Sequence, residues 1–434
     1  MRSPLAFYSM RVLAVGLVIV AVMGVLRGFF QGFSNMIPTA VSKVVEQIVN
    51  AIISVVGAYI LISMGNRYAL ERAEPSLGMA YGAAGGTLGT TIGALAGFLF
   101  LVFIYFINRK FVKRQIAKDR TRHRESTKRL LKILILTSIP VILSSVIMNV
   151  TTLIDMGIFN QVLANQGVDA AERAAMVGMF SGKYKIMITL PLAMVTGLST
   201  SILPSLSAAV ATGKKDDAFL RISQSVRFTM LVAIPCFIGY VALASPIMVV
   251  LFNDPEPMPA QMLMMGAISV VFFSWSAILS TVLQGLDRMK LPVINAAISL
   301  AIHIVVLLFM LIVLEWHVYA LVLSNVVFAA AMWFFNARSL KKAAGYRQEY
   351  IKPIVKPLLS SLVMGIVAFA IHYLLNRAIG GRVLPTLVAI IFGAMVYLIV
   401  LLKSGAMSRH DVFALPKGSK IMGLLEKVHL APRR

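Results

Sequence analysis

Long apolar runs dominate this sequence and limit what it can fold into. Eleven runs of about 20 or more mostly apolar residues follow one another, and a helix needs about that length to cross a bilayer. The runs have to be helical because backbone N–H and C=O groups find no water in hydrocarbon. Hydrophobic residues make up 59% of the chain and charged residues 13%, a balance that a soluble domain could not sustain. We therefore predict an all-α polytopic membrane protein with about eleven transmembrane helices.

Basic residues in the loops between these runs predict the topology. The runs lie near residues 10–30, 40–64, 78–107, 131–156, 184–211, 227–252, 261–285, 291–314, 317–337, 354–375 and 383–402. The segment 108–132 carries eleven Lys or Arg against Asp119 and Glu125, so the positive-inside rule places it in the cytoplasm. Alternation then places 214–227, 287–290, 338–356 and the tail from Lys403 on the same side, and 67–74, 253–256 and 315–317 outside. The formal net charge of +24 follows from this topology, and we expect no nucleic-acid binding.

The sequence lacks the motifs of the common catalytic and nucleotide-binding sites. Its single cysteine, Cys236, cannot form a disulfide framework or a cysteine-based metal site within one chain. There is no P-loop, zinc-ligand spacing or nucleophile motif. The external segment 253–256 offers Asp254 and Glu256 beside prolines, whereas a membrane glycosyltransferase would need clustered carboxylates. We expect a protein that is not an enzyme and has no cofactor.

A pattern of loop residues recurs after six helices. The first two runs are joined by RGFFQG at 27–32 with Pro38 shortly after, and the seventh and eighth by LQGLDR at 283–288 with Pro292 shortly after. Paired repeats are common in transporters, where the substrate path lies between two similar bundles. The fourth to ninth runs would then form one six-helix bundle, and the first three runs the second half of another. Chance similarity between two loops is the alternative.

This repeat predicts five segments and an incomplete first bundle. Residues 1–107 form the second half of an N-terminal lobe, 108–132 a basic cytoplasmic linker, 133–340 a six-helix C-terminal lobe, 341–403 two additional helices and 404–434 a basic cytoplasmic tail. An external N-terminus bearing Arg2 and Arg11 is awkward, because positive flanks resist translocation. Three further helices before Met1 would return the N-terminus to the cytoplasm, so we expect that three helices are missing there.

Three stretches carry a resemblance to a known family. They are RGFFQG at 27–32 through MIPTA at 36–40 with Glu46-Gln47, SIP at 138–140 with LID at 153–155, and LP at 190–191 with SILPSL at 201–206. Together they resemble the MurJ/SpoVB/YtgP branch of the MOP (multidrug/oligosaccharidyl-lipid/polysaccharide) exporter superfamily, over essentially the whole chain. The resemblance implies a MOP/MATE-like bundle of two six-helix lobes and two extra helices, here without the first three. It implies lipid-linked cell-wall precursors as substrates.

Polar residues on the second run form one stripe at helical spacing, made of Lys43, Glu46, Gln47 and Asn50. Ionisable groups inside a membrane are costly and are usually functional or paired, and such a stripe can face a water-filled cavity. We expect these residues, with Arg27 at the end of the first run, to contact the substrate. A pair within the helix, from Lys43 to Glu46 or Gln47, is the alternative.

Two lysines that open the fifth run are further candidates for substrate binding. Lys183 and Lys185, like Arg27, could meet a pyrophosphate, which concentrates negative charge. The alternative for each is snorkelling to lipid headgroups. The lone His303 and His372 lie on apolar runs, where histidines are more often packed and hydrogen-bonded than proton carriers, so we assign them no role.

Oxygen-bearing side chains at the end of the fourth run predict a cation site. Asp155 follows Asn149, Thr151 and Thr152, and hard oxygen ligands of this type hold Na⁺ or take up a proton. Candidate co-ligands on the eighth and ninth runs are Asn295, Ser299, Ser324 and Asn325. In the family that the sequence resembles, an acidic residue here can belong to a cation site in the second lobe. An interfacial Asp that caps the helix end is the alternative.

The resemblance predicts a flippase for peptidoglycan biosynthesis. It would move an undecaprenyl-pyrophosphate-linked precursor, lipid II, across the bacterial cytoplasmic membrane by alternating access, with Na⁺ or H⁺ coupling. The expected partners are the lipid-linked oligosaccharide, membrane lipids and cell-wall synthesis proteins. The alternatives are another lipid-linked polysaccharide flippase, a multidrug or cation antiporter of the MATE branch, and a non-transporting fragment.

Overall fold

All regular structure in the described residues of the computed structural model is helical. Those residues are 6–33, 37–72, 77–118, 126–213, 215–346, 349, 351–405, 422–423 and 426. Nine of the helices within these ranges are long and apolar enough to cross a bilayer. The runs predicted at 131–156 and 184–211 fall in α4 (Thr127–Asn165) and α6 (Lys185–Ala211), which are also long helices. The prediction of an all-α polytopic membrane protein is confirmed.

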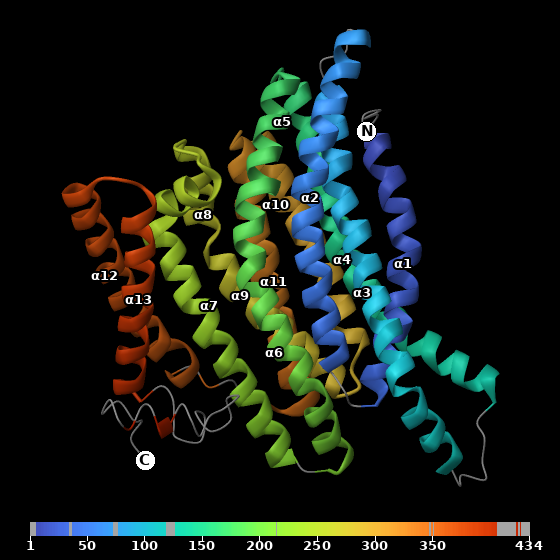
Figure 1. The fold of residues 1–434 in the computed structure, drawn as a ribbon. Coiled ribbons are helices and arrows are strands. Elements are labelled where there is room, and N and C mark those ends of the chain that lie inside the picture. Colours follow the sequence, from blue (N-terminus) through green and yellow to red (C-terminus); the bar gives the residue numbers. More distant parts are fainter. Residues whose placement is uncertain are drawn as a thin grey trace. The chain divides into compact units, whose positions relative to one another are not determined.

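The chain divides into two compact units, Met1–Ser126 and Thr127–Arg434. The first unit contains α1 (Ala6–Gly32), α2 (Ile37–Arg72) and α3 (Leu77–Lys118). The second contains α4, α5 (Ala170–Met179), the π-helix η1 (Phe180–Tyr184), α6, α7 (Lys215–Phe252), α8 (Pro257–Gly266), α9 (Ile268–Gly285), α10 (Lys290–Ile312), α11 (His317–Ala344), the π-helix η2 (Ile351–Val355), α12 (Lys356–Ile379) and α13 (Val383–Lys403). Figure 1 shows both units in chain order by colour.

Glycines let α2 and α3 approach closely in the first unit. A Cβ atom added to Gly85 would lie 2.2 Å from the carbonyl oxygen of Gly57, and one added to Gly93 would lie 2.7 Å from that of Glu46. Small residues at such positions allow backbone-to-backbone packing in membranes, where lipid tails remove most of the hydrophobic driving force between helices. Gly86, on another face of α3, has no such neighbour within 4 Å.

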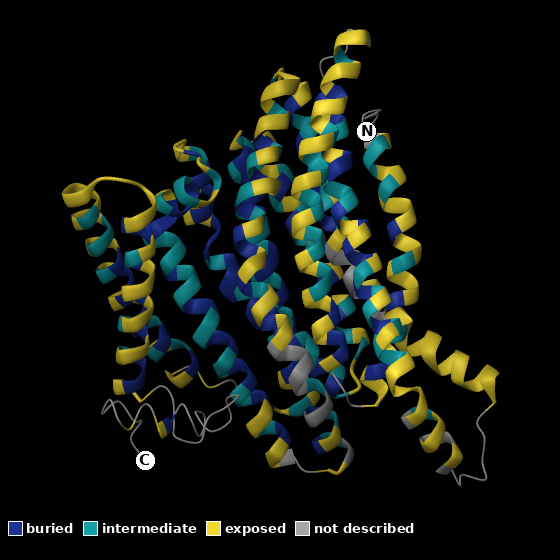
Figure 2. Cartoon of the chain, in the orientation of Figure 1, coloured by how far each residue is buried: buried dark blue, intermediate teal, exposed yellow. Residues whose placement is uncertain are grey.

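The second unit has a continuous apolar core formed mainly by α6 to α11. Fully buried side chains from different helices meet there, including Phe159, Met230, Met248, Leu263, Ile278 and Leu321. Buried residues are frequent in α7 and α9, whereas exposed residues run along much of α12 and α13 (Figure 2). Most exposed residues on these last two helices are apolar, as expected for faces solvated by lipid.

Two helix boundaries differ from the sequence prediction. Helix α4 continues to Asn165, so Asp155 lies inside a helix and the interpretation of this residue as a helix-end cap is wrong. The run 261–285 is divided into α8 and α9 at Ala267. There the Ser269 hydroxyl donates to the Gly266 carbonyl at 2.6 Å, and a side-chain bond of this kind competes with the helical backbone ladder.

Candidate functional site

An ion pair joins α1 and α2 in the first unit. The Arg27 guanidinium donates to Glu46 Oε2 at 2.7 Å and to Ser42 Oγ at 3.1 Å. Both charged side chains are mostly buried, with 16% and 20% of their surfaces exposed. Glu46 therefore pairs with the preceding helix, and the interpretation of Glu46 as the partner of Lys43 within its own helix is wrong. The pair brings together two of the residues that we predicted to contact substrate.

The other members of the predicted polar stripe separate into two environments. Lys43 and Gln47 are exposed. Asn50 lies at the contact of α2 with α3, where Ser54 Oγ is 2.9 Å from Asn50 Oδ1 and 2.8 Å from the carbonyl oxygen of Gly86. Asn50 thus has a role in helix packing, and within the predicted stripe Lys43 and Gln47 are the members with exposed polar ends.

A buried ionisable pair lies inside the second unit. Asp155 of α4 is 2% exposed and His303 of α10 is completely buried. The distance between His303 Nε2 and Asp155 Oδ1 is 2.5 Å, and Asn325 Nδ2 of α11 lies 3.4 Å from Asp155 Oδ2. Three helices thus converge on one carboxyl group, far from either end of α4, and ionisable groups so deep in a membrane protein are usually functional.

The hydrogen-bond pattern of His303 determines how many protons this pair holds. Its Nδ1 atom lies 2.9 Å from the carbonyl oxygen of Ser324, which can only accept, so Nδ1 carries a hydrogen. The short contact between Nε2 and Asp155 Oδ1 also requires a proton, because two lone pairs would otherwise face each other. Either an imidazolium faces a carboxylate or a neutral ring faces a protonated carboxyl. In both cases the pair holds one exchangeable proton and has no net charge.

Lys185 extends this centre by one turn of α4. Its ammonium donates to Thr152 Oγ1 at 2.6 Å, three residues before Asp155. Lys185 was predicted to contact substrate and Asp155 to bind a cation, and the structure places them in one cluster. Among the predicted co-ligands, Asn325 contributes its side chain and Ser324 only its backbone carbonyl. We define Asp155, His303, Asn325, Thr152 and Lys185 as the acidic centre.

Two other predicted co-ligands belong to a separate network. Asn295 Nδ2 donates to Asn336 Oδ1 at 2.8 Å, and Asn336 Nδ2 donates to Ser276 Oγ at 2.9 Å. These neutral amides tie α9, α10 and α11 together, a common use of polar side chains between membrane helices. Ser299 donates to the carbonyl of Asn295, four residues earlier in its own helix. The structure does not bring Asn295 or Ser299 to Asp155.

Lys183 has a carboxylate partner at one end of the second unit. It forms an ion pair with Asp254, which follows α7, and Asp254 Oδ1 also accepts from the backbone N–H of Glu256 at 2.9 Å. The hydrogen bond from Lys183, followed by that from the Glu256 backbone, holds the pKa of Asp254 below its ordinary value. Lys183 and Asp254 fall on the same external side in the predicted topology, and the pair fastens η1 to the loop before α8.

Sequence reasoning missed two features of the second unit. His303 was left without a role because a lone histidine on an apolar run has no local signal, and its partner is 148 positions away. A cavity of about 840 Å³ between α4, α10 and α11 is lined by Arg288, Lys290 and Lys342, with one carboxylate from Asp287. Charge counting assigned these cations to topology alone, although they also line a cavity.

Comparison with known proteins gives a consistent result. A family model described as "Lipid II flippase MurJ" matches residues 4–393. The chain is 23% identical over 396 residues to the lipid II flippase MurJ of Bacillus subtilis (strain 168), which covers 89% of this chain and 70% of that protein. Two solved structures share the fold. A MATE protein in a bent conformation has a TM-score of 0.57 at 15% identity, covering 78% of this chain and 70% of its own. MurJ in an inward-closed conformation has a TM-score of 0.52 at 17% identity, covering 91% and 83%.

Proposed function

Because the chain belongs to the MurJ family, whose model matches residues 4–393, we propose that it is a flippase for an undecaprenyl-pyrophosphate-linked cell-wall precursor, lipid II. Members of this family are membrane transporters, and this chain is a multi-pass protein of the bacterial cytoplasmic membrane. The family match is the observation that carries the proposal. The identity of the substrate is the more specific part of the proposal, because 23% identity is also compatible with another lipid-linked saccharide.

The proposed transport cycle couples precursor movement to a cation at the acidic centre. Asp155 and His303 already hold one proton between them, and a Na⁺ ion would have to replace that proton to use the carboxylate. Moving one elementary charge through 100 mV contributes about 2.3 kcal/mol, enough to bias two conformations of similar free energy. Lys43 and Gln47, the exposed members of the polar stripe on α2, remain our proposed contacts for the precursor headgroup, together with Arg27.

A flipping assay in proteoliposomes tests the substrate. Fluorescent lipid II is incorporated, and the fraction that reaches the opposite leaflet is measured with a quencher that does not cross the bilayer. Lipid II should equilibrate faster than in protein-free liposomes, and an unlabelled lipid-linked capsule precursor should compete weakly. Stronger competition by the capsule precursor would identify that lipid, and not lipid II, as the preferred substrate. Equal rates with and without protein, for both lipids, would contradict the flippase proposal.

The role of the acidic centre is tested separately with Asp155→Asn. We expect roughly a tenfold or greater loss of flipping rate under an imposed Na⁺ or pH gradient, because the variant lacks the carboxylate that exchanges the cation. Asp217→Asn, the same chemical change at an exposed site in the first turn of α7, is the matched control and should leave the rate unchanged. A gradient-dependent rate in Asp155→Asn equal to that of the wild type would exclude coupling at this centre. Thermal unfolding of both variants shows whether they are folded.

A further inference from the structure

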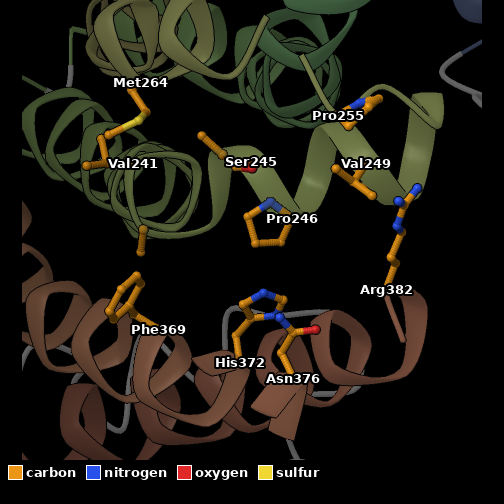
Figure 3. Close-up of a pocket in the computed structure, with 12 residues that line it drawn as sticks. Val241, Ser245, Pro246, Val249, Pro255, Met264, Phe369, His372, Asn376 and Arg382 are labelled. Atoms are coloured by element: carbon orange, nitrogen blue, oxygen red, sulfur yellow. The ribbon is translucent and has the colours of Figure 1, made fainter. Parts of the chain in front are cut away.

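A cavity of about 620 Å³ separates α7 from α12 near one end of the second unit. Its walls include Val241, Pro246 and Val249 of α7, Phe369 of α12, and Met264 of α8 (Figure 3). The turn between α12 and α13 lies at the same end. Alternating loop charges place that end outside the cytoplasm, so the cavity is at the level of the outer leaflet.

A bend in α7 shapes one wall of this cavity. Leu243 departs from helical geometry, with φ −121° and ψ 24°, and Pro246 follows three residues later. Pro246 has no N–H to donate to the carbonyl of Ala242, and Ala242 itself lines the cavity. This wall therefore includes a backbone carbonyl, that of Ala242, which would accept a hydrogen bond within an uninterrupted helix.

Hydrogen-bond donors line the opposite side. Figure 3 shows His372 and Asn376 of α12 pointing across the cavity towards Pro246, and Arg382, which directly precedes α13, pointing towards Val249. No Asp or Glu is among the described residues that line the cavity. In the part of the chain that the structure describes, Arg382 has no carboxylate partner, in contrast to Arg27 and Lys183.

The remaining surface of the cavity is apolar and open to lipid. Val241, Val249 and Phe369 contribute hydrocarbon, and the Phe369 side chain is 56% exposed on a helix that is long enough to span the bilayer. A ligand that fits has to combine an anionic group near Arg382 with a hydrocarbon body along Phe369. Membrane lipids combine these two features, and basic pockets between transmembrane helices are known to hold their headgroups.

We propose that this cavity binds an anionic glycerophospholipid of the outer leaflet through its single phosphodiester. The site offers one permanent cation, Arg382, with the neutral amide of Asn376 and the His372 ring, which matches one negative charge. A pyrophosphate carries more negative charge and would lack a second cation here. The lipid is therefore distinct from the transported precursor, and its acyl chain lies between the bent α7 and α12.

Thermal unfolding of the full-length protein in detergent tests this site. Phosphatidylglycerol should raise Tm in the wild type, whereas phosphatidylcholine with the same acyl chains should raise it less. Arg382→Gln should weaken the apparent affinity for phosphatidylglycerol by roughly tenfold. Arg377→Gln is the matched control, because Arg377 lies near the same end of α12 and outside the cavity lining. This variant should respond like the wild type.

Four results would each overturn the proposal. Equal losses in Arg382→Gln and Arg377→Gln would mean that the lipid responds to net charge and not to this cavity. An unchanged response in Arg382→Gln would place the lipid elsewhere. A stabilisation of the same size by inorganic phosphate alone would indicate a free-anion site. If Arg382→Gln does not fold, a second variant, Asn376→Leu, is used. Native mass spectrometry counts the phosphatidylglycerol molecules that it retains. Retention equal to that of the wild type would contradict the site. None of these readouts depends on transport.

Discussion

Single side chains show how this membrane protein accommodates charge. Asp155 and His303 are almost fully buried, and their shared proton leaves the pair neutral. Lys183 and Asp254, outside the membrane-spanning helices, form an ion pair whose carboxylate also accepts from the backbone N–H of Glu256. At both sites the charges balance within the pair, because an unpaired buried charge is costly to desolvate.

At the residue scale, we expect His303→Ala to be strongly destabilising. The substitution leaves Asp155 buried with only the Asn325 amide at 3.4 Å, and breaking a buried pair by removing one partner costs roughly 3–5 kcal/mol. Chemical denaturation in detergent micelles measures this change. The double variant Asp155→Ala/His303→Ala should lose less than the sum of the two single variants. Simple additivity would mean that the two side chains do not interact.

A second prediction at this scale concerns acid. The pKa of Asp254 is lowered in the folded protein, so its pairing contributes stability above the ordinary Asp value and loses that contribution as pH falls through the folded pKa. Wild-type Tm should therefore decrease on acidification below about pH 4. Asp254→Asn should have a free energy of unfolding lower by on the order of 1 kcal/mol at neutral pH, and its Tm should decrease less in acid. Parallel pH profiles for the two proteins would contradict this assignment.

The effect of a glycine or a proline in these helices depends on which helix packs beside it. In α3, glycines occupy several faces, but only some of them meet another backbone. In α7, Pro246 and Leu243 produce a bend that α12 packs beside. Glycine thus permits close packing only where another helix backbone lies next to it, and a proline such as Pro246 frees a backbone carbonyl that neighbouring groups must satisfy.

At the element scale, two nearby glycines of α3 should respond differently to the same change. Gly85→Ala puts a methyl group against the Gly57 carbonyl and should destabilise the α2–α3 contact by roughly 1–3 kcal/mol. Gly86→Ala adds the same methyl group where no atom lies within 4 Å and should leave stability nearly unchanged. Thermal unfolding of the two variants measures the difference. Equal effects would show that α2 and α3 do not meet through Gly85.

At the scale of the whole molecule, the charges of the loops predict on which side of the membrane each loop lies. The basic segments alternate with weakly charged ones, and the Lys183–Asp254 pair joins two segments that this alternation places on the same side. The acidic centre lies between the ends of its three helices, where a change of one charge acts on several helices at once. The cation coupling that we propose would act through this site, where moving a charge is sensitive to the membrane potential.

The predicted topology can be measured by cysteine labelling. In a Cys236→Ala background, a maleimide that does not cross membranes should label Glu315→Cys in intact cells, because 315–317 lies outside in the charge-based prediction. Lys342→Cys should be labelled only after permeabilisation. The reverse pattern would invert the topology, and labelling of both in intact cells would contradict the helix count between them.

The class of protein and the approximate helix positions were determined by the sequence alone, and the sides of the loops remain a prediction from its charges. Each depends on a local and additive property of the sequence. A helix needs about 20 mostly apolar residues to span the hydrocarbon core, and short basic loops resist translocation. Tertiary structure decided which charges are paired. Arg27 with Glu46, Lys183 with Asp254 and Asp155 with His303 join residues from different segments, so no local pattern predicts them. The free energy of a buried charge depends on the one group that faces it, and only the packed helices determine which group that is.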